Sequence, residues 1–380
     1  MIYQSTYQAA KIAAPKLEAI FAEHLRAAKE SGEDDLAPLP PAMLIEHILD
    51  ATFWASLRKE EGHNTKISLA FVSPEQAGNP LLFKHRLPLN PTTLTKIAPG
   101  VERAGVHIGV WHEGNELYVW GTTIVIPNYC FIIDVSEPGL LVIKHRRIYG
   151  FGKYTNVAVL KGEQIKIVDT TSPRSHDWPT MLLTLLDLMA PSYWNDSVNV
   201  LIQLAVSMRA HQRGGTLLVV PSNNNNWLQS IVKPILYGIQ PSFNGLTKLL
   251  IEDRKDASQI FWQTALKREV DHLAGLTAVD GATVVNDRYE LLAFGVKIGR
   301  AKGKEFLDEL SFSEPIVGGG AVVMPAAKIG GTRHLSAAQF VSDQKDAMAL
   351  VASQDGFFTI FSWSVRNNRL QAHRIDTLLL

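Results

Sequence analysis

The chain has 380 residues, of which 46% are hydrophobic and 19% charged, so it can bury a sizeable core and is long enough for two domains. Lysine and arginine together number 37, as do aspartate and glutamate, which gives a formal net charge of +0. This balance excludes a broad basic surface for nucleic acid or anionic lipid, while a local basic pocket stays open.

Two further features bear on the cellular setting. The first 21 residues lack a basic segment followed by a continuous apolar run, and no later apolar run approaches the ~20 residues that span a bilayer. We therefore expect a soluble, cytoplasmic protein. Its single cysteine, Cys130, lies in an apolar run typical of a strand, which predicts a buried structural thiol rather than a nucleophile.

The N-terminal part begins with two predicted helices. Residues 7–30 have apolar side chains at helical spacing, and the acidic, proline-rich residues 31–41 that follow predict a linker. A second helix is predicted from about Ala42 to Glu60, with one apolar stripe that we expect to pack in the core. The stripe comprises Leu44, Ile45, Ile48, Leu49, Phe53, Trp54 and Leu57.

From Lys66 to Val168 the pattern changes to short runs rich in β-branched and aromatic residues, which predicts a mostly antiparallel sheet. Within it, the segment KHRRIYGFGKY (144–154) combines four lysine and arginine side chains, two tyrosines and two glycines. These residues are suited to a pocket for an anion. A solvated hairpin with an aromatic edge is the interpretation that we favour.

The C-terminal part alternates helices and strands. Helices are predicted at 178–190, 198–212 and 257–276, and a helical pattern at 227–239 that Pro234 would kink. Apolar strands include GGTLLVVP, DGATVVN, ELLAFGVKI, AMALVAS and FFTIFSWSV, and VGGGAVV is a glycine-rich turn before another strand. The order predicts an α/β fold, with an α+β region at 1–175 and a second domain at 176–380.

Two short motifs carry groups suited to ligand binding. Asp280-Gly281-Ala282 holds a carboxylate between a helix and a strand, and by itself is also typical of an ordinary Asp-Gly turn. Gly330-Gly331-Thr332-Arg333-His334 offers free backbone, a hydroxyl and a forked cation to phosphate oxygens, or else a capped helix start with an exposed arginine. Ser336-Ala337-Ala338 predicts the first helical turn after it, with amides that favour an anion.

The order of these pieces, from GGTLLVVP through DGATVV and GGTRHLSAA to AMALVASQDG, is the informative feature. Over about residues 195–365 it resembles the diadenylate cyclase (DAC) domain, which carries an apolar strand, a DGA motif, a GTRHR motif, and a strand ending in serine and an acidic residue. The corresponding positions here are Asp280, Gly281 and Ala282; Thr332, Arg333 and His334; and Ser353 with Asp355.

The resemblance implies a mixed central sheet flanked by helices and a site for an adenine nucleotide or cyclic dinucleotide. Asp280 would help to hold a divalent metal, Mg²⁺ or Mn²⁺, near the ribose and α-phosphate, and the GTRH loop would bind the phosphates; no organic cofactor is implied. In active members two such sites face each other in a dimer and condense two ATP molecules to cyclic di-AMP. The resemblance thus allows a homo-oligomer.

The chain departs from the active motif at Leu335, which replaces its second arginine. Losing one transition-state donor costs about 2.7–4 kcal/mol, enough to cripple turnover while binding largely persists. The wider layout, with RKEEGH, EPGLLVIK and GGTLLVVP, is most similar to the DAC-related group called DACNV, regarded as nucleotide sensors. We therefore predict a nucleotide-binding sensor; the alternatives are an active diadenylate cyclase and an interaction protein whose motifs are structural relics.

Other enzyme classes lack support in the sequence. The twelve histidines form no HExxH or CxxH motif, so a zinc site is not indicated. GxSxG and GxxxxGK[ST] are absent as well, which removes the commonest hydrolase and P-loop signals.

Overall fold

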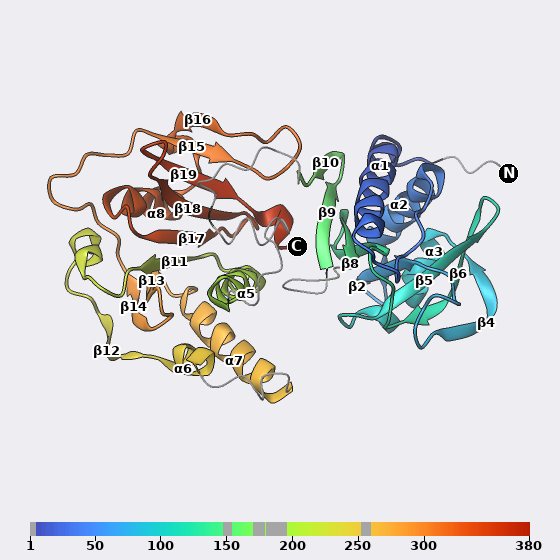
Figure 1. Ribbon diagram of the computed structural model, residues 1–380, viewed down its shortest axis with the longest axis horizontal. Coiled ribbons are helices and arrows are strands. Elements are labelled where there is room, and N and C mark those ends of the chain that lie inside the picture. Colours follow the sequence, from blue (N-terminus) through green and yellow to red (C-terminus); the bar gives the residue numbers. More distant parts are fainter. Residues whose placement is uncertain (1–4, 147–153, 170–178, 180–195, 252–259) are drawn as a thin grey trace. The chain divides into compact units, whose positions relative to one another are not determined.

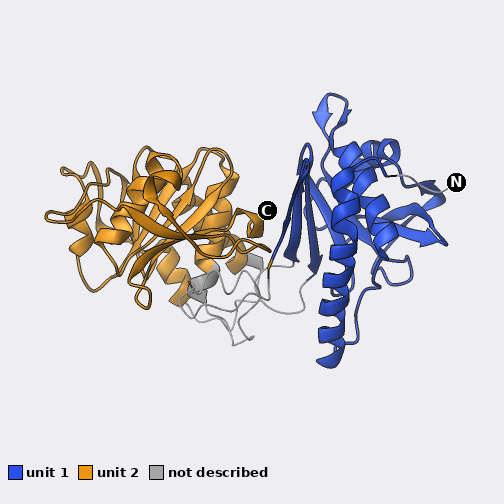
Figure 2. Cartoon of the chain, turned by 90° about the horizontal axis from the view of Figure 1, so that it is seen from above, with its two compact units in different colours: residues 1–168, 380 blue, residues 169–379 orange. Residues whose placement is uncertain are grey.

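The computed structural model describes residues 5–146, 154–169, 179, 196–251 and 260–380 (Figure 1). The chain divides into two compact units, unit 1 with residues 1–168 and Leu380, and unit 2 with residues 169–379 (Figure 2). The predicted domain boundary after residue 175 and, apart from Pro179, the predicted helix at 178–190 lie outside the described residues.

The described part of unit 1 contains two long α-helices, one short α-helix, the β1–β2 hairpin and an eight-stranded sheet. The sheet has the order β10-β9-β8-β7-β3-β5-β6-β4 and is antiparallel except between β3 and β5. This confirms the predicted α+β region. The helices are α1 (Gln8–Glu30), α2 (Ala42–Ser56) and α3 (Pro91–Ile97), and the strands are β1 (Lys59–Glu60), β2 (His63–Asn64), β3 (Ile67–Phe71), β4 (Leu81–Pro88), β5 (His107–Glu113), β6 (Glu116–Thr123), β7 (Phe131–Glu137), β8 (Leu140–Arg146), β9 (Tyr154–Lys161) and β10 (Gln164–Ile167).

The core of unit 1 lies between helices α1 and α2 and one face of the sheet. Alternate strand residues such as Leu69 and Ile133 point to this face, where they pack with Phe21 from α1 and Ile45 from α2. All four side chains are at most 1% exposed. Burial of this apolar surface supplies the main driving force for docking the helices on the sheet.

The start of α1 is held by a carboxylate from α2. The side chain of Asp50 accepts hydrogen bonds from the backbone N–H groups of Thr6, at 2.8 Å, and Tyr7, at 2.7 Å. The Tyr7 ring stacks on Phe53 with ring centroids 3.7 Å apart. The N–H groups of Thr6 and Tyr7 have no carbonyl partner within the helix. Asp50, which is 4% exposed, accepts hydrogen bonds from them in place of water.

The predicted second helix is shorter than expected, and two members of its stripe are not core residues. Helix α2 ends at Ser56, and Trp54 and Leu57 are 38% and 48% exposed. The Trp54 indole N–H donates to the Thr6 hydroxyl at 2.8 Å, which holds the ring at the surface. Their predicted burial is therefore wrong, because the sheet contacts only the other side of this last turn.

Unit 2 is built on a nine-stranded mixed sheet with the order β12-β14-β13-β11-β17-β18-β19-β15-β16. The pairs β11–β13 and β15–β19 are parallel and the others antiparallel. The helices are α5 (Asp196–Ala210), α6 (Gly245–Ile251), α7 (Ile260–Leu276) and α8 (Thr332–Asp343), and the strands are β11 (Gly215–Val220), β12 (Tyr237–Phe243), β13 (Ala282–Asn286), β14 (Leu291–Val296), β15 (Glu309–Ser313), β16 (Val322–Pro325), β17 (Met348–Ala352), β18 (Phe358–Ser364) and β19 (Arg369–Arg374).

Both faces of this sheet are covered. Helix α8 packs on one face through Ala337 and Val341, against Leu218 and Val351. The alternate strand residue Leu217 is also fully buried, so the opposite face is shielded too. Helices α5 and α7 pack together and contact β17 and β14. The architecture confirms the predicted α/β fold with a mixed sheet flanked by helices.

The helical pattern at 227–239 does not form an α-helix. A 3-10 turn covers Asn226–Ser230, an isolated β-bridge then joins Ile231 to Ile298, and the chain bends before β12 begins at Tyr237. Val232 donates its N–H to the carbonyl of Lys297, which draws the segment to the sheet. The prediction is wrong because Pro234 lacks an N–H and disfavours the helical conformation before it.

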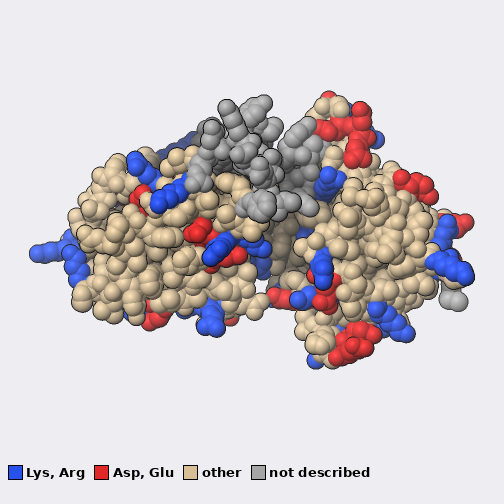
Figure 3. All heavy atoms as spheres, turned by 90° about the horizontal axis from the view of Figure 1, so that it is seen from below, with Lys and Arg blue, Asp and Glu red and all other residues tan. Residues whose placement is uncertain are grey.

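No helix in the described ranges is long and apolar enough to cross a membrane. Figure 3 draws a face on which basic and acidic side chains are interspersed, in keeping with the balanced net charge. The predicted burial of Cys130 is confirmed, and desolvation raises the pKa of its thiol, which keeps it protonated and unreactive.

We predict that Asp50→Ala lowers the free energy of unfolding by about 3 kcal/mol, because two backbone N–H groups lose a charged, buried acceptor. Asp50→Asn keeps an oxygen acceptor and should cost about 1 kcal/mol. Urea denaturation followed by circular dichroism measures both values. Equal stability of Asp50→Ala and the parent chain would contradict this account.

Candidate functional site

The Asp280-Gly281-Ala282 motif lies where the chain enters β13. Gly281 has φ of +112°, and a Cβ built there would lie 2.6 Å from the carbonyl carbon of Gly295. Only glycine fits, because both the positive φ and the close strand exclude a side chain. Asp280 precedes this constriction and points to solvent, with its side chain 87% exposed.

The Gly330-to-His334 motif forms the start of α8. Gly331 is the N-cap and Thr332 the first helical residue, so the helix begins four residues earlier than predicted. The reason is local: Gly331 adopts extended geometry, and its carbonyl accepts from the N–H groups of His334 and Leu335. Thr332 is exposed, and Arg333 is half-buried. Ser336 therefore lies in the second turn, not the first.

Ser353 and Asp355 lie in the turn that joins β17 to β18. The Ser353 hydroxyl accepts from the N–H of Phe357 at 3.1 Å, and its own N–H donates to the carbonyl of Phe357 at 2.9 Å. Asp355 is exposed at the tip of this turn. The hydroxyl of Ser353 thus serves the turn, while its proton is available to a ligand.

The register of the sheet brings these motifs to one edge. Thr216 of β11 pairs with Ala282 of β13, and Gly215 pairs with Ala352 of β17. The residues that flank these pairs, including Gly281 and Ser353, therefore leave the sheet on the same side. Gly281 and Ser353, which are 72 residues apart in the sequence, thus lie at one edge of three adjacent strands.

Arg333 reaches this edge from α8. A Cβ built on Gly214 would lie 2.8 Å from a terminal nitrogen of the Arg333 guanidinium and 3.2 Å from the carbonyl oxygen of Ala352. The guanidinium thus lies directly over Gly214, which has φ of +69°. The sequence analysis assigned Gly214 no role in the site. The Gly214-Gly215 pair before the strand could have indicated that the backbone is closely approached there.

The charges of Lys297 and Arg333 both affect the pKa of the Asp280 carboxyl. The pKa of the Asp280 carboxyl is lowered, first by the hydrogen bond and charge of Lys297 and then, less strongly, by Arg333. Lys297, which follows β14, forms an ion pair with Asp280, and its side chain is 58% exposed. Sequence analysis did not identify Lys297, because the pair depends on the β13–β14 register.

His334 lies inside the unit. It is 5% exposed, and its ring meets Phe361 edge-on with centroids 6.2 Å apart. Burial, followed by the charges of Arg374 and Arg333, lowers its pKa to about 4. The ring is therefore neutral at pH 7 and packs under α8 rather than adding positive charge. Leu335 is 37% exposed on the same helix.

The described residues offer the divalent metal implied by the resemblance one carboxylate, that of Asp280, and no complete set of protein ligands. In the described ranges, no group of three or more His, Cys, Asp or Glu side chains could hold a metal ion. Asp280 is the carboxylate assigned to it, and that carboxylate is already paired with Lys297. A Mg²⁺ ion at a nucleotide site is usually bound through one or two carboxylates, waters and substrate phosphates, so here it would have to arrive with the nucleotide.

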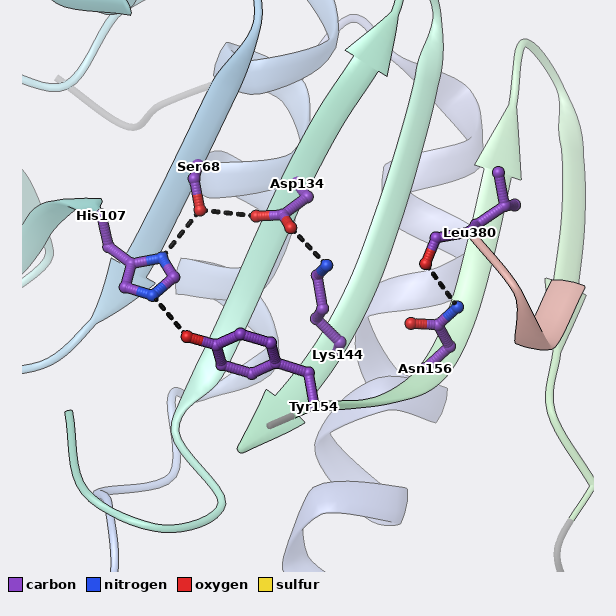
Figure 4. Close-up of polar contacts among 7 residues, drawn as sticks. All are labelled: Ser68, His107, Asp134, Lys144, Tyr154, Asn156 and Leu380. Carbon is purple, nitrogen blue, oxygen red and sulfur yellow. Dashed lines mark hydrogen bonds and ion pairs between the residues drawn. The ribbon is translucent and has the colours of Figure 1, made fainter. Parts of the chain in front are cut away.

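Unit 1 holds a polar network that sequence analysis missed (Figure 4). The Ser68 hydroxyl donates to Asp134 at 2.5 Å, so its oxygen accepts from Nδ1 of His107, 2.7 Å away. Nε2 of His107 lies 2.8 Å from the Tyr154 hydroxyl, and Lys144 pairs with Asp134. The network links β3, β5, β7, β8 and β9, which fixes their register.

The structure also bears on the anion pocket considered for residues 144–154, because three side chains of this segment already have partners. Lys144 is neutralised by Asp134, and the guanidinium of Arg146 donates to the carbonyl of Ile126. His145 is 4% exposed and stacks on Tyr129 with centroids 4.6 Å apart. These three side chains are committed within unit 1; residues 147–153 lie outside the described ranges.

Comparison with known proteins gives a family match over part of unit 1 and matches to solved structures. Residues 34–124 match the family DACNV, described as a probable sensor domain. The match lies within unit 1 and does not extend to Asp280 or Arg333. No curated protein matches the chain. A crystal structure of a hypothetical membrane spanning protein from Bacillus cereus is similar, with 14% identity, a TM-score of 0.28, and coverage of 51% of this chain and 70% of that chain.

We predict that Lys297→Ala raises the pKa of the Asp280 carboxyl toward its ordinary value, because Lys297 is the main cause of its lowering. Carboxyl-carbon NMR over a pH series measures the shift. Lys302→Ala removes another exposed amine and should leave the Asp280 pKa unchanged. An identical Asp280 titration in all three proteins would show that the ion pair does not form in solution.

Proposed function

We propose that unit 2 binds an adenine nucleotide or a cyclic dinucleotide and that the chain is a nucleotide sensor. The observation that carries the proposal is Arg333, a half-buried arginine at the first turn of α8 and over Gly214. In the part of the chain that the structure describes, it has no hydrogen-bond or ion-pair partner. A guanidinium held in this way has its N–H groups free for phosphate oxygens.

The surroundings of Arg333 are suited to the rest of such a ligand. The first amides of α8 point along the helix axis with unsatisfied N–H groups, which favours negative charge. Gly214 and Gly281 keep the edge free of side chains, so a ligand can approach the backbone. Asp280 and Ser353 offer an acceptor and a hydroxyl for ribose or base. The match of residues 34–124 to a probable sensor domain supports a sensing role for the chain.

Binding without efficient turnover is the form of this function that the site favours. Leu335 is exposed on the first turns of α8 and supplies neither charge nor donor at the position of the second motif arginine. Positioning and charge neutralisation carry phosphoryl transfer, so a missing cation weakens the transition state more than the bound ground state.

We predict that Arg333→Ala weakens binding of ATP or cyclic di-AMP at least about tenfold, because bonds to charged groups contribute about 1.5–3 kcal/mol. Arg366→Ala removes an exposed guanidinium from the β18–β19 turn and should change affinity less than about twofold. Isothermal titration calorimetry on the three proteins measures this. Equal affinities in folded variants would remove Arg333 from the site.

We further predict that the purified chain converts little ATP to cyclic di-AMP in the presence of Mn²⁺, although it binds the nucleotide. Mass spectrometry of the reaction mixture detects the product. Robust synthesis that Asp280→Asn abolishes would establish the cyclase instead. Absence of any nucleotide binding would favour an interaction protein with relic motifs.

A further inference from the structure

A second basic feature lies in unit 1 and shares no residue with the motifs of unit 2. A recess of about 400 Å³ lies between the β1 hairpin and α3. Its lining residues are Arg58, Lys59, Glu60, Thr92, Thr95 and Lys96. The recess is wide open to solvent, so it suits the charged part of a ligand and does not enclose a whole molecule.

The recess carries an excess of positive charge. Three of its side chains, Arg58, Lys59 and Lys96, are cations, and Glu60 is the one carboxylate that lines it. Among the ion pairs of the described residues, none involves these four groups. Uncompensated cations around one concavity concentrate anions, even though the whole chain has a formal net charge of +0.

Two hydrogen bonds restrain Arg58 at the rim of the recess. One terminal nitrogen of its guanidinium donates to the Thr92 hydroxyl at 2.7 Å, and its carbonyl accepts from the Thr65 hydroxyl at 2.7 Å. The other guanidinium N–H groups have no partner in the described ranges, and the Thr92 hydroxyl keeps its proton to donate. A fixed fork beside a hydroxyl matches the oxygens of a phosphate group.

The lysines and Glu60 define the ligand further. Lys59 and Lys96 are exposed on the hairpin and on α3 and can reach a second phosphate group as point charges. Glu60 offers an acceptor to a hydroxyl or amine of the same molecule. A free anion of one charge would leave most of these groups unused.

We infer that this recess binds a small molecule that carries a di- or triphosphate group and a hydroxyl or amine donor. All six lining residues lie within residues 34–124, the segment that matches a probable sensor domain. The site is independent of the proposed nucleotide site, because it belongs to unit 1 and shares no residue with it.

Calorimetric titration of inorganic triphosphate tests the inference, at low salt, without divalent metal, and in the Arg333→Ala chain so that the unit 2 site does not contribute. Arg58→Ala should weaken binding about tenfold, and Arg58→Lys, which keeps the charge but loses the fork, about threefold. Glu60→Gln should tighten binding about threefold, because it removes a repelling carboxylate. Arg103→Ala, an exposed guanidinium of the same unit, is the control and should change little.

Two results would overturn the inference: no saturable binding of triphosphate, or equal affinities for Arg58→Ala and Arg103→Ala in chains with parental circular dichroism. Comparison with a nucleoside triphosphate identifies the second half of the ligand. Tighter binding of the nucleoside form, lost in Glu60→Ala, which removes the acceptor, supports the assigned role of Glu60, and equal binding of both forms contradicts it. The comparison of Arg58→Ala with Arg103→Ala separates this recess from the unit 2 site, because neither substitution changes a residue of the unit 2 motifs.

Discussion

The pairing of β11 with both β13 and β17 determines where the chemically informative residues of unit 2 lie. Because β11 is parallel to β13 and antiparallel to β17, the start of one neighbour and the end of the other share an edge with Gly215. A shift of one residue in either pairing would move a motif to the other face of the sheet. The buried, alternating side chains on both faces hold the register in place.

Two glycines keep the motif-bearing edge of unit 2 free of side chains. Gly214 leaves space for the Arg333 guanidinium, and Gly281 leaves space for the backbone of β14. A side chain at either position would collide with its neighbour or require a strained backbone. Among the described residues, Arg333 at this edge has no hydrogen-bond or ion-pair partner, and the Asp280 carboxylate is paired with Lys297. This arrangement favours recognition of an anion over the assembly of a resident metal centre.

Local patterns predicted much of the fold. The apolar spacing of residues 7–30 and the β-branched runs from Lys66 to Val168 specify their own conformation, because one face of each must be buried. Long-range contacts were not predictable in this way. The Ser68–His107–Asp134 network and the Asp280–Lys297 pair depend on strand register. The pattern at 227–239 was misread because Pro234 and a backbone bond to Lys297 override its spacing.

A crystal structure of the chain with ATP bound tests the central claim, that the motif-bearing edge of unit 2 is a nucleotide site. The account predicts phosphate oxygens within hydrogen-bond distance of the Arg333 guanidinium, beside Gly214 and the first turn of α8. A nucleotide bound elsewhere in unit 2, with Arg333 free of contact, would contradict it.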